Sequence, residues 1–234
     1  MNNHDQDGFE YIYIEKRKAS SNILVGRGSP MRRLLIIAGG IDHPPQDAQL
    51  VLETMLRNLK NTEVVHIHSL NVLPAELAFD VMVLYMHENE VSRSAIINFE
   101  RYVGSGGGVL AIHSATASFM NSHEYHEILG GRFNQHGPIS RFVLIPEVNL
   151  EIFRESSSFM VEDELYLHDT LPGVQPHFYA LLDGKKIPVV WTYRYGIGRI
   201  FYAVPGHTLE SMDNPNYQAL LKTGLVWVCN GEKH

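Results

Sequence analysis

The sequence predicts an α/β protein built on a doubly wound, mostly parallel sheet. Short apolar runs bounded by turn residues alternate with segments of helical periodicity, as in Arg33–Ala38 followed by the apolar positions between residues 51 and 59. The stretch Gly104–Phe119 repeats this pattern: a glycine turn, the apolar run Val109–Ile112, and then His113 followed by helix-capping hydroxyls. Connections of this kind are right-handed and place helices on the faces of the sheet. Residues that follow the strands then gather at the carboxyl edge, where α/β proteins bind ligands.

Length and composition narrow the class of protein. The 234 residues suffice for one large domain with a buried core, and we take residues 31–230 as that domain. A formal charge of −7 argues against a broad basic surface for nucleic acid. No apolar run approaches the roughly 20 residues of a membrane span, and the amino terminus lacks a basic-then-apolar signal. The single cysteine, Cys229, excludes an internal disulfide, so we expect a cytoplasmic protein. From the charge and the apolar runs, we expect it to bind neither nucleic acid nor membranes.

Residues 1–30 are predicted to be an appendage to the domain. Phe9–Glu15 alternates apolar and polar residues and predicts a strand, and Ile23–Val25 is a candidate return strand. Gly26–Pro30 is typical of a linker. Such a hairpin could extend a sheet edge or contact a second copy of the chain, so a homo-oligomer is one expectation. For the first eight residues, a loose polar tail is an equal alternative.

The first half of the domain predicts strands alternating with helices. The strands are Arg33–Ala38, Glu63–His68, a part of Ala78–Met86, and Val109–Ile112. The helices begin near Pro45, Ser92 and Ser122, which are residues that favour the first helical turn or its cap. Glycines follow the last two helices, as is common at helix ends.

The second half predicts four more strands: Arg141–Ile145, Pro176–Leu182, Pro188–Tyr193 and the return strand Arg199–Val204. Of these, Pro176–Leu182 and Pro188–Tyr193 are expected to be antiparallel or to lie at an edge. The sequence YGIG at residues 195–198 predicts a hairpin turn between the last two. Phe159–Leu167 mixes apolar and acidic residues, and its structure stays ambiguous. A final helix is predicted over Tyr217–Val228.

Histidine is unusually frequent, with 13 residues, and its placement carries most of the functional information. Four histidines follow predicted strands, and a fifth lies in a glycine-flanked loop: His43, His87, His113, His207 and His136. In a parallel sheet these loops open at one edge. Nearby glycines, including Gly40 and Gly107, allow close backbone approach to a ligand. We therefore expect His43, His113, His136 and His207 to share one site.

The other histidines have structural interpretations. His87 is interpreted as a surface loop residue, and His66 and His68 as packing or edge positions of a strand. His123 and His126 are expected to be solvated on a helix. His168 and His177 lie near predicted turns and give no signal.

The chemistry of such a cluster is open between two alternatives. Neutral imidazoles bind zinc, and three of them with an open position activate water. A single histidine instead serves as a general acid or base. Neither paired cysteines nor a His-Glu-x-x-His motif is present, so a divalent metal such as zinc is only weakly specified. The run GSGGG is not a phosphate loop, because it lacks the lysine and precedes a strand.

Two further groups of residues are candidates for the site. Asp163, Glu164 and Tyr166 could supply an acid, a base or a hydroxyl donor, with a solvated acidic turn as the alternative. Arg194 and Arg199 could neutralise an anionic or enolate-like oxygen. Surface salt bridges, which contribute little to stability, are the alternative for the two arginines.

Several motifs together resemble the ThuA-like (trehalose-utilisation) family of the class I glutamine amidotransferase-like superfamily. They are GGIDHP, YVGSGGGVLAIHSATASF, EYHEILGGRFNQHGP, DELY, PVVWTYRYGIGRIFYAVPGHT and LLKTGLVWV, in order between Arg33 and Val228. The resemblance implies a flavodoxin-like three-layer α/β/α sandwich. It also implies that His113 occupies the bend where glutamine amidotransferases carry cysteine. Because Cys229 lies in the last predicted helix, glutamine hydrolysis by a thiol is not expected.

The resemblance further implies a role in carbohydrate metabolism, with a small sugar or keto-sugar as ligand. The predicted catalytic residues are His113, Glu164 and Tyr166. The predicted substrate-binding residues are Gly40, Gly107, Arg199 and His207, and the metal alternative uses His43, His113, His136 and His207. Two segments depart from the family pattern: PGH at residues 205–207 and the less basic turn TYRYGIG.

Three hypotheses follow for function. The first is an enzyme, a hydrolase or isomerase that acts on a small sugar-derived carbonyl compound. The second is a non-catalytic module that binds a ligand or metal on the same scaffold. The third is a structural subunit that assembles through Phe9–Val25.

Overall fold

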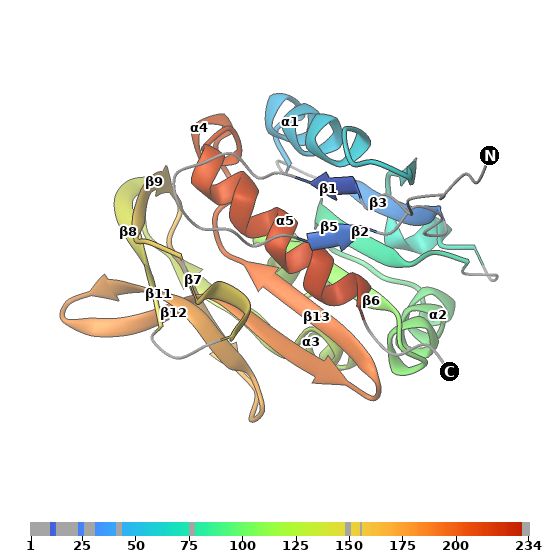
Figure 1. Ribbon diagram of the computed structural model, residues 1–234. Helices are drawn as coiled ribbons and strands as arrows, with labels where there is room; N and C mark the ends of the chain where they lie inside the picture. The colour runs from blue at the N-terminus through green and yellow to red at the C-terminus, as the bar shows by residue number, and fades with distance from the viewer. Residues whose placement is uncertain are drawn as a thin grey trace, which may run out of the picture.

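The computed structural model describes residues 10–12, 23–25, 31–40, 44–74, 78–147, 151–154 and 156–230. Its largest element is a nine-stranded mixed sheet in the order β4-β3-β5-β6-β13-β12-β11-β8-β9 (Figure 1). The first five strands are parallel, and the last four join them through antiparallel pairings. The protein is therefore a mixed α/β protein in which a parallel half and an antiparallel half share one sheet.

The parallel half matches the apolar runs of the sequence. Its strands are β3 (Arg32–Gly40), β4 (Thr62–Ile67), β5 (Val81–His87), β6 (Gly108–Ile112) and β13 (Gly198–Ala203). Nearly every residue of the central strands β5 and β6 is buried, as expected for parallel strands covered on both faces. The edge strand β4 is only partly buried.

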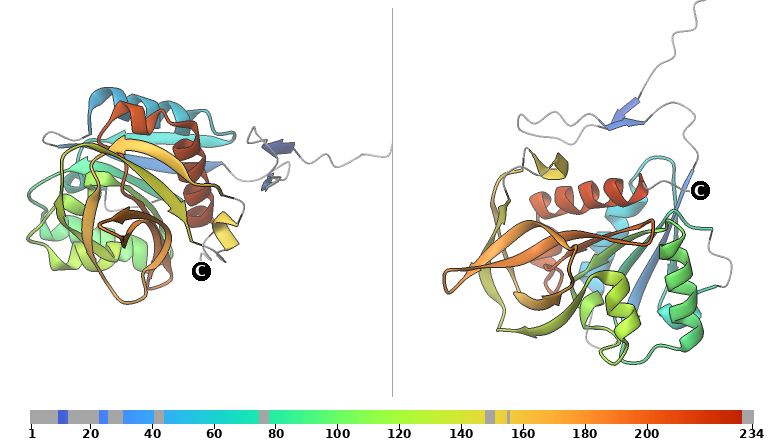
Figure 2. Two further views of the ribbon diagram at one scale, coloured as in Figure 1. Left: turned by 90° about the vertical axis from the view of Figure 1, so that its left-hand side faces the viewer. Right: turned by 90° about the horizontal axis from the view of Figure 1, so that it is seen from below.

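The helices lie on both faces of this sheet (Figure 2). They are α1 (Gln46–Arg57), α2 (Arg93–Gly104), α3 (His123–Leu129), α4 (Leu209–Met212) and α5 (Pro215–Cys229). Side chains that accept hydrogen bonds from the first turn cap four of them: Ser92, Ser122, Thr208 and Asn214. Helix α5 packs against β13 and β6, and α2 packs against α3 (Figure 1). None of the helices in the described ranges is long and apolar enough to cross a membrane.

The antiparallel half confirms the strands predicted after residue 140. They are β8 (Ser140–Pro146), β9 (Phe159–Asp163), β11 (Gln175–Leu182) and β12 (Lys185–Tyr195). Strands β12 and β13 form the predicted hairpin, in which Tyr195 pairs with Gly198. The ambiguous stretch Phe159–Leu167 contains a break: β9 ends at Asp163, and β10 (Tyr166–Thr170) begins three residues later in a different sheet.

A second, two-stranded sheet was not predicted. Strand β7 (Gly131–His136) pairs antiparallel with β10, and His136 lies opposite Tyr166 in the register. The prediction of a loop around His136 was therefore wrong. Strand β7 is largely exposed in its second half and polar on both sides there, so it lacks the apolar alternation that marks a strand in sequence.

Shorter elements complete the chain. The predicted hairpin of the appendage is present as β1 (Glu10–Ile12) paired antiparallel with β2 (Ile23–Val25). The linker predicted at residues 26–30 lies outside the described residues. Three 3-10 helices are η1 (Leu70–Val72), η2 (His113–Ala117) and η3 (Glu151–Phe153).

Candidate active site

His113 lies at a sharp bend where the central strand β6 ends. Ile112 is the last residue of the strand, and His113 begins η2 with a φ of 48°, a left-handed conformation that costs energy for a residue with a side chain. The residue is completely buried. Its Nδ1 lies 2.9 Å from the carbonyl oxygen of Val204, at the end of the neighbouring strand. Because a carbonyl only accepts, Nδ1 carries the proton and Nε2 is left to face the site.

The turn after β13 brings His207 to His113. Strands β13 and β6 are parallel neighbours, and Ala203 pairs with Ile112, so both strands end side by side. A Cβ on Gly206 would lie 2.6 Å from the Cβ of His113, which is closer than two side chains can approach. Glycine is therefore required at position 206 for this contact. The rings of His113 and His207 meet edge to face, with centroids 5.7 Å apart.

A buried carboxylate holds this turn in place. Asp163 is fully buried at the end of β9 and accepts hydrogen bonds from the backbone N–H groups of Gly206, His207 and Thr208, at 3.0, 3.1 and 3.3 Å. On the other side of the turn, the hydroxyls of Tyr85 and Tyr217 donate to the carbonyls of Gly206 and Pro205. The main chain of the turn is thus fixed through both its donors and its acceptors.

Glu164 points its carboxylate at three imidazoles. Its Oε2 lies 3.6 Å from Nε2 of His113 and 3.3 Å from Nδ1 of His207. Its Oε1 lies 3.5 Å from Nδ1 of His136, which itself lies 2.7 Å from the carbonyl oxygen of Gly137. The adjacent residues Asp163 and Glu164 therefore have different roles: Asp163 accepts hydrogen bonds from backbone N–H groups, and Glu164 contacts the histidine rings.

Tyr166 forms the aromatic wall of the cluster. Its ring lies against His113, with centroids 4.1 Å apart, and against His136 at 5.3 Å. Phe133 of β7 also packs against Tyr166, with ring centroids 4.5 Å apart. Tyr166 is itself almost fully buried. Three of the predicted site histidines thus meet around one carboxylate and one phenol.

The electrostatics of the site favour an ionised Glu164. Burial alone would raise the pKa of this carboxyl group, but the contact with His113 and the nearby charges of His207 and His136 lower it below its usual value. Burial, together with the Glu164 and Asp163 charges, raises the pKa of the Tyr166 hydroxyl. At neutral pH the site therefore holds a carboxylate next to a protonated phenol.

A hydrogen-bond network supports the main chain beneath His113. The buried Tyr202 hydroxyl donates to the carbonyl oxygen of His113 at 2.8 Å and lies 3.1 Å from Nε2 of His168. Thr116 of η2 lies 2.9 Å from the same nitrogen. Burial lowers the pKa of His168 to about 3, with a smaller contribution from His113, so this ring stays neutral. His168 thus acts as structural support.

The side chains of the cluster differ in their exposure to solvent. The exposed fraction of the side chain rises from 0% for His113 through 12% for Glu164 and 25% for His207 to 37% for His136. A ligand that approaches past His136 and His207 therefore meets Glu164 before His113.

The structure does not bring every predicted residue to the cluster. His43 lies outside the described residues. Gly40 ends β3, where it pairs with His87, and a Cβ there would collide with the His87 carbonyl. Gly107 and Arg199 lie at the amino ends of β6 and β13, the edge opposite to His113, and Arg199 donates to the carbonyl of Trp227. The predicted substrate contacts of Gly107 and Arg199 are therefore incompatible with this cluster.

Several supporting residues carried no clear signal in the sequence. Asp163 was only one member of an acidic stretch, and the roles of Tyr85, Tyr202 and Tyr217 depend on contacts across more than ten residues of chain. The prediction that His126 is solvated was wrong, since it is 6% exposed.

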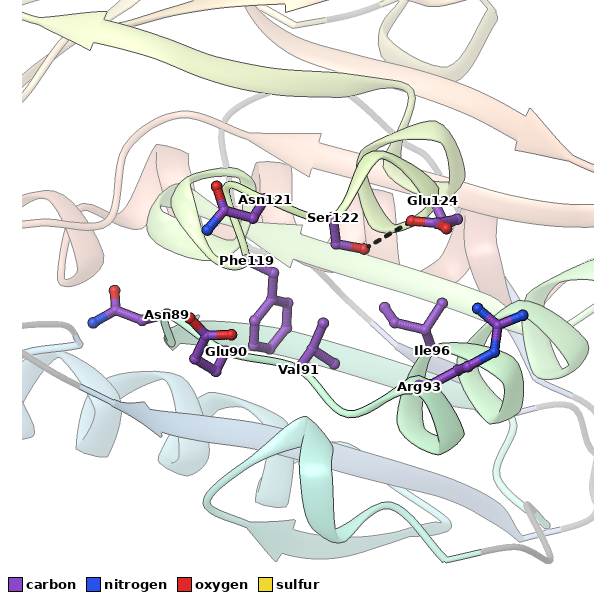
Figure 3. A pocket seen from close by; sticks show the side chains of 9 residues that line it. All are labelled: Asn89, Glu90, Val91, Arg93, Ile96, Phe119, Asn121, Ser122 and Glu124. Carbon is purple, nitrogen blue, oxygen red and sulfur yellow. Dashed lines mark hydrogen bonds between the residues drawn. The ribbon is translucent and has the colours of Figure 1, made fainter.

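Two cavities lie elsewhere on the surface. One, of about 230 Å³, lies near the first residues of α2 and α3 (Figure 3). Its lining consists of Asn89, Glu90, Val91, Arg93, Ile96, Phe119, Asn121, Ser122 and Glu124. The other, of about 350 Å³, lies between α1 and α5. Neither is lined by the residues that surround Glu164.

The fold and the site define a mixed α/β protein with a histidine–carboxylate cluster at the carboxyl edge of its parallel strands. A family model described as trehalose utilisation (ThuA) matches residues 33–228. The chain therefore belongs to the ThuA family. No curated protein matches the sequence.

Solved structures share the fold at low sequence identity. A ThuA-like protein from Parabacteroides merdae ATCC 43184 matches with a TM-score of 0.76 and 22% identity, over 88% of this chain and 92% of the other. A cytoplasmic protein from Salmonella typhimurium LT2 matches with a TM-score of 0.62 and 15% identity, over 85% and 97%. A β-galactosidase from Bacillus circulans sp. alkalophilus matches with 0.59 and 12%, over 85% of this chain and 30% of the other.

Proposed function

We propose that the protein is an enzyme of carbohydrate metabolism, a hydrolase or isomerase that acts on a small sugar-derived carbonyl compound such as a keto-sugar. Membership of the trehalose-utilisation family supports the substrate class. The observation that carries the reaction type is the convergence of His113, His207 and His136 on the Glu164 carboxylate, beside the Tyr166 phenol. We place this enzyme in the cytoplasm, on a flavodoxin-like three-layer sandwich.

The groups at the cluster suit proton transfer next to a carbonyl. The carboxylate of Glu164 accepts a proton from a carbon acid or from water, because it is ionised and partly shielded from solvent. Tyr166 keeps its proton at neutral pH and can donate a hydrogen bond to the oxygen that becomes negative. His207 and His136 lie on the open side, where they can bind sugar hydroxyls. His113 serves either as the base or as a metal ligand.

Glutamine amidotransfer is not part of the proposal. The residue at the bend after β6 is an imidazole, and Cys229 is the last residue of α5, a helix that packs against the sheet. A thiol nucleophile is therefore missing from the position that such chemistry needs.

A turnover assay with keto-disaccharides and keto-monosaccharides tests the proposal. The protein should release a hydrolysis or isomerisation product, and His113→Ala should abolish turnover while circular dichroism and the thermal midpoint show a folded chain. The exposed His123→Ala is the matched control and should keep full activity. Unchanged turnover in His113→Ala, at equal protein concentration, contradicts the assignment.

A non-catalytic binding module is the second candidate. The same cluster supports it, because two imidazoles and a carboxylate can hold a ligand or a metal ion without catalysing a reaction. Calorimetry separates the two candidates, because a binding module shows affinity for a keto-sugar without forming a product over long incubation.

A further inference from the structure

We infer that Nε2 of His113, Nδ1 of His207 and Oε2 of Glu164 together bind one divalent transition-metal ion of the zinc class. The three atoms come from three separate segments and all lie within 4.8 Å of one another. The role of such an ion in turnover rests on the proposed function, but binding of the ion does not. This set replaces the all-histidine set expected from the sequence, with Glu164 as the new member.

The distances suit ligands of one small ion better than direct ion pairs. Charge-assisted N–H···O hydrogen bonds are usually about 2.7–2.9 Å long. The Glu164 oxygen lies 3.6 Å from His113 and 3.3 Å from His207. Two ligand atoms that each lie about 2.0–2.1 Å from a tetrahedral zinc ion are separated by about 3.3–3.5 Å. Both observed nitrogen–oxygen separations are close to this value.

The tautomer of His113 also supports a metal site. Its Nδ1–H donates to the carbonyl of Val204, so in the neutral ring the lone pair of Nε2 faces the Glu164 carboxylate inside the protein. A ligating histidine that donates its other N–H to a backbone carbonyl is the usual arrangement around bound metals, because this hydrogen bond fixes the ring.

The donor chemistry indicates which ion fits. Two imidazoles and one carboxylate form the ligand set of several catalytic zinc sites, in which a fourth position stays open for water or substrate. His136 is oriented differently: its Nδ1 lies 2.7 Å from the Gly137 carbonyl and so carries a proton in the neutral ring. With the ring in this orientation, His136 lies beside the ion as a polar group on the open side.

Metal binding can be measured directly on the full chain, purified without a histidine tag and stripped with a chelator. Zinc titrated by calorimetry should bind at one ion per chain. Cobalt(II) should give the intense visible absorption of a four- or five-coordinate site. Glu164→Gln and His207→Ala should each weaken binding of both ions by more than about 100-fold, since even the loss of a group behind a ligand costs 10–100-fold.

His66→Ala is the matched control. His66 also faces a carboxylate, with Nδ1 3.3 Å from Oε1 of Glu53, but it lies in β4 at the edge of the sheet. This variant should bind zinc as the wild type does. The thermal midpoint of each stripped variant shows that it is folded, and Glu164→Gln preserves the shape of the side chain.

Wild-type affinity in both Glu164→Gln and His207→Ala, or no zinc binding by the wild type at millimolar zinc, overturns the inference. Turnover of a keto-sugar by the stripped protein, with no metal bound, overturns a role of the ion in turnover and leaves the proposed function standing. If the protein binds one ion but turns over no keto-sugar, the proposed function is overturned and the metal site stands. The two proposals therefore fail on different measurements.

Discussion

The backbone N–H of His207 donates to the carboxylate of Asp163 at 3.1 Å, across 44 residues of chain. The same carboxylate also binds the N–H groups of Gly206 and Thr208. This contact joins the antiparallel half of the sheet, where Asp163 ends β9, to the turn that follows the parallel strand β13. The main chain of His207 is thus held in place by a carboxylate of β9.

Asp163→Asn should loosen this turn. The amide keeps one acceptor oxygen but loses the negative charge that three N–H groups share, and hydrogen bonds to a charged group are worth about 1.5–3 kcal/mol. We expect the free energy of unfolding in urea to fall by about 2 kcal/mol. Turnover and zinc affinity should both fall, because His207 shifts. Glu162→Gln, which alters an exposed carboxylate bound to Arg141, should cost less than about 1 kcal/mol and is the control.

Gly206→Ala should displace the ring of His113. The added methyl group would lie 2.6 Å from its Cβ, and overpacking of this kind costs about 1–3 kcal/mol. We expect a loss of turnover that exceeds the loss of stability, measured as kcat at a temperature where the variant is folded. Gly104→Ala meets no atom within 4 Å and should behave like the wild type. Full activity of Gly206→Ala would show that the approach of the two residues is not needed.

Tyr202→Phe should weaken the support under His113. The variant removes the shorter of two hydroxyl donors to the buried His113 carbonyl, 2.8 Å away, and leaves only the Thr116 hydroxyl at 3.2 Å. We expect a loss of about 1–3 kcal/mol in unfolding free energy, seen as a lower midpoint in urea. Tyr195→Phe removes a hydroxyl that binds Glu100 at the exposed surface and should change the midpoint far less. Equal midpoints for the two variants would contradict this account.

Buried histidines should make the protein sensitive to mild acid. Burial lowers the pKa of His126 and of His177 to about 4, against an ordinary value of 6.5. Between these values the unfolded chain binds more protons than the folded chain, so stability falls as the pH drops from about 6.5 toward 4. Each such residue contributes up to about 1.4 kcal/mol per pH unit.

His177→Gln isolates one of these contributions. The residue is 1% exposed, binds Thr192 and lies away from the cluster. Urea midpoints measured from pH 7 to pH 5 should fall less steeply for this variant than for the wild type. The exposed His123→Gln should keep the wild-type slope. A wild-type slope in His177→Gln would mean that the ring is already protonated or solvated in the folded chain.

The centre of the parallel half was predictable because β5 and β6 are continuous apolar runs. The bend at His113 followed from the same pattern, since a glycine turn, a buried run and capping residues occur in order. The antiparallel pair of β7 and β10 was not predictable, because the polar end of β7 gives no periodic signal. The neighbourhood of His136 and Tyr166 depends on that pairing.

Strand direction decides at which edge of the sheet each predicted site residue lies. Gly107 precedes β6 and Arg199 begins β13, so both had to lie at the amino edge, whereas His113 and His207 follow those strands. The inclusion of Glu164 depends on the break between β9 and β10, where Asp163 and Glu164 point different ways. A sequence pattern carries no record of which of two adjacent carboxylates contacts the histidines and which binds the backbone.

The polar side chains that support His113 and His207 bind main-chain groups and not the imidazole rings. This bears on how members of the family can come to differ in activity. Asp163, Tyr85, Tyr217 and Tyr202 all bind main-chain atoms of residues 113 and 205–208. The scaffold therefore shapes the loops independently of the side chains that they display. Different reactive side chains can therefore replace the histidines at positions 113 and 207 while the backbone that orients them keeps its conformation.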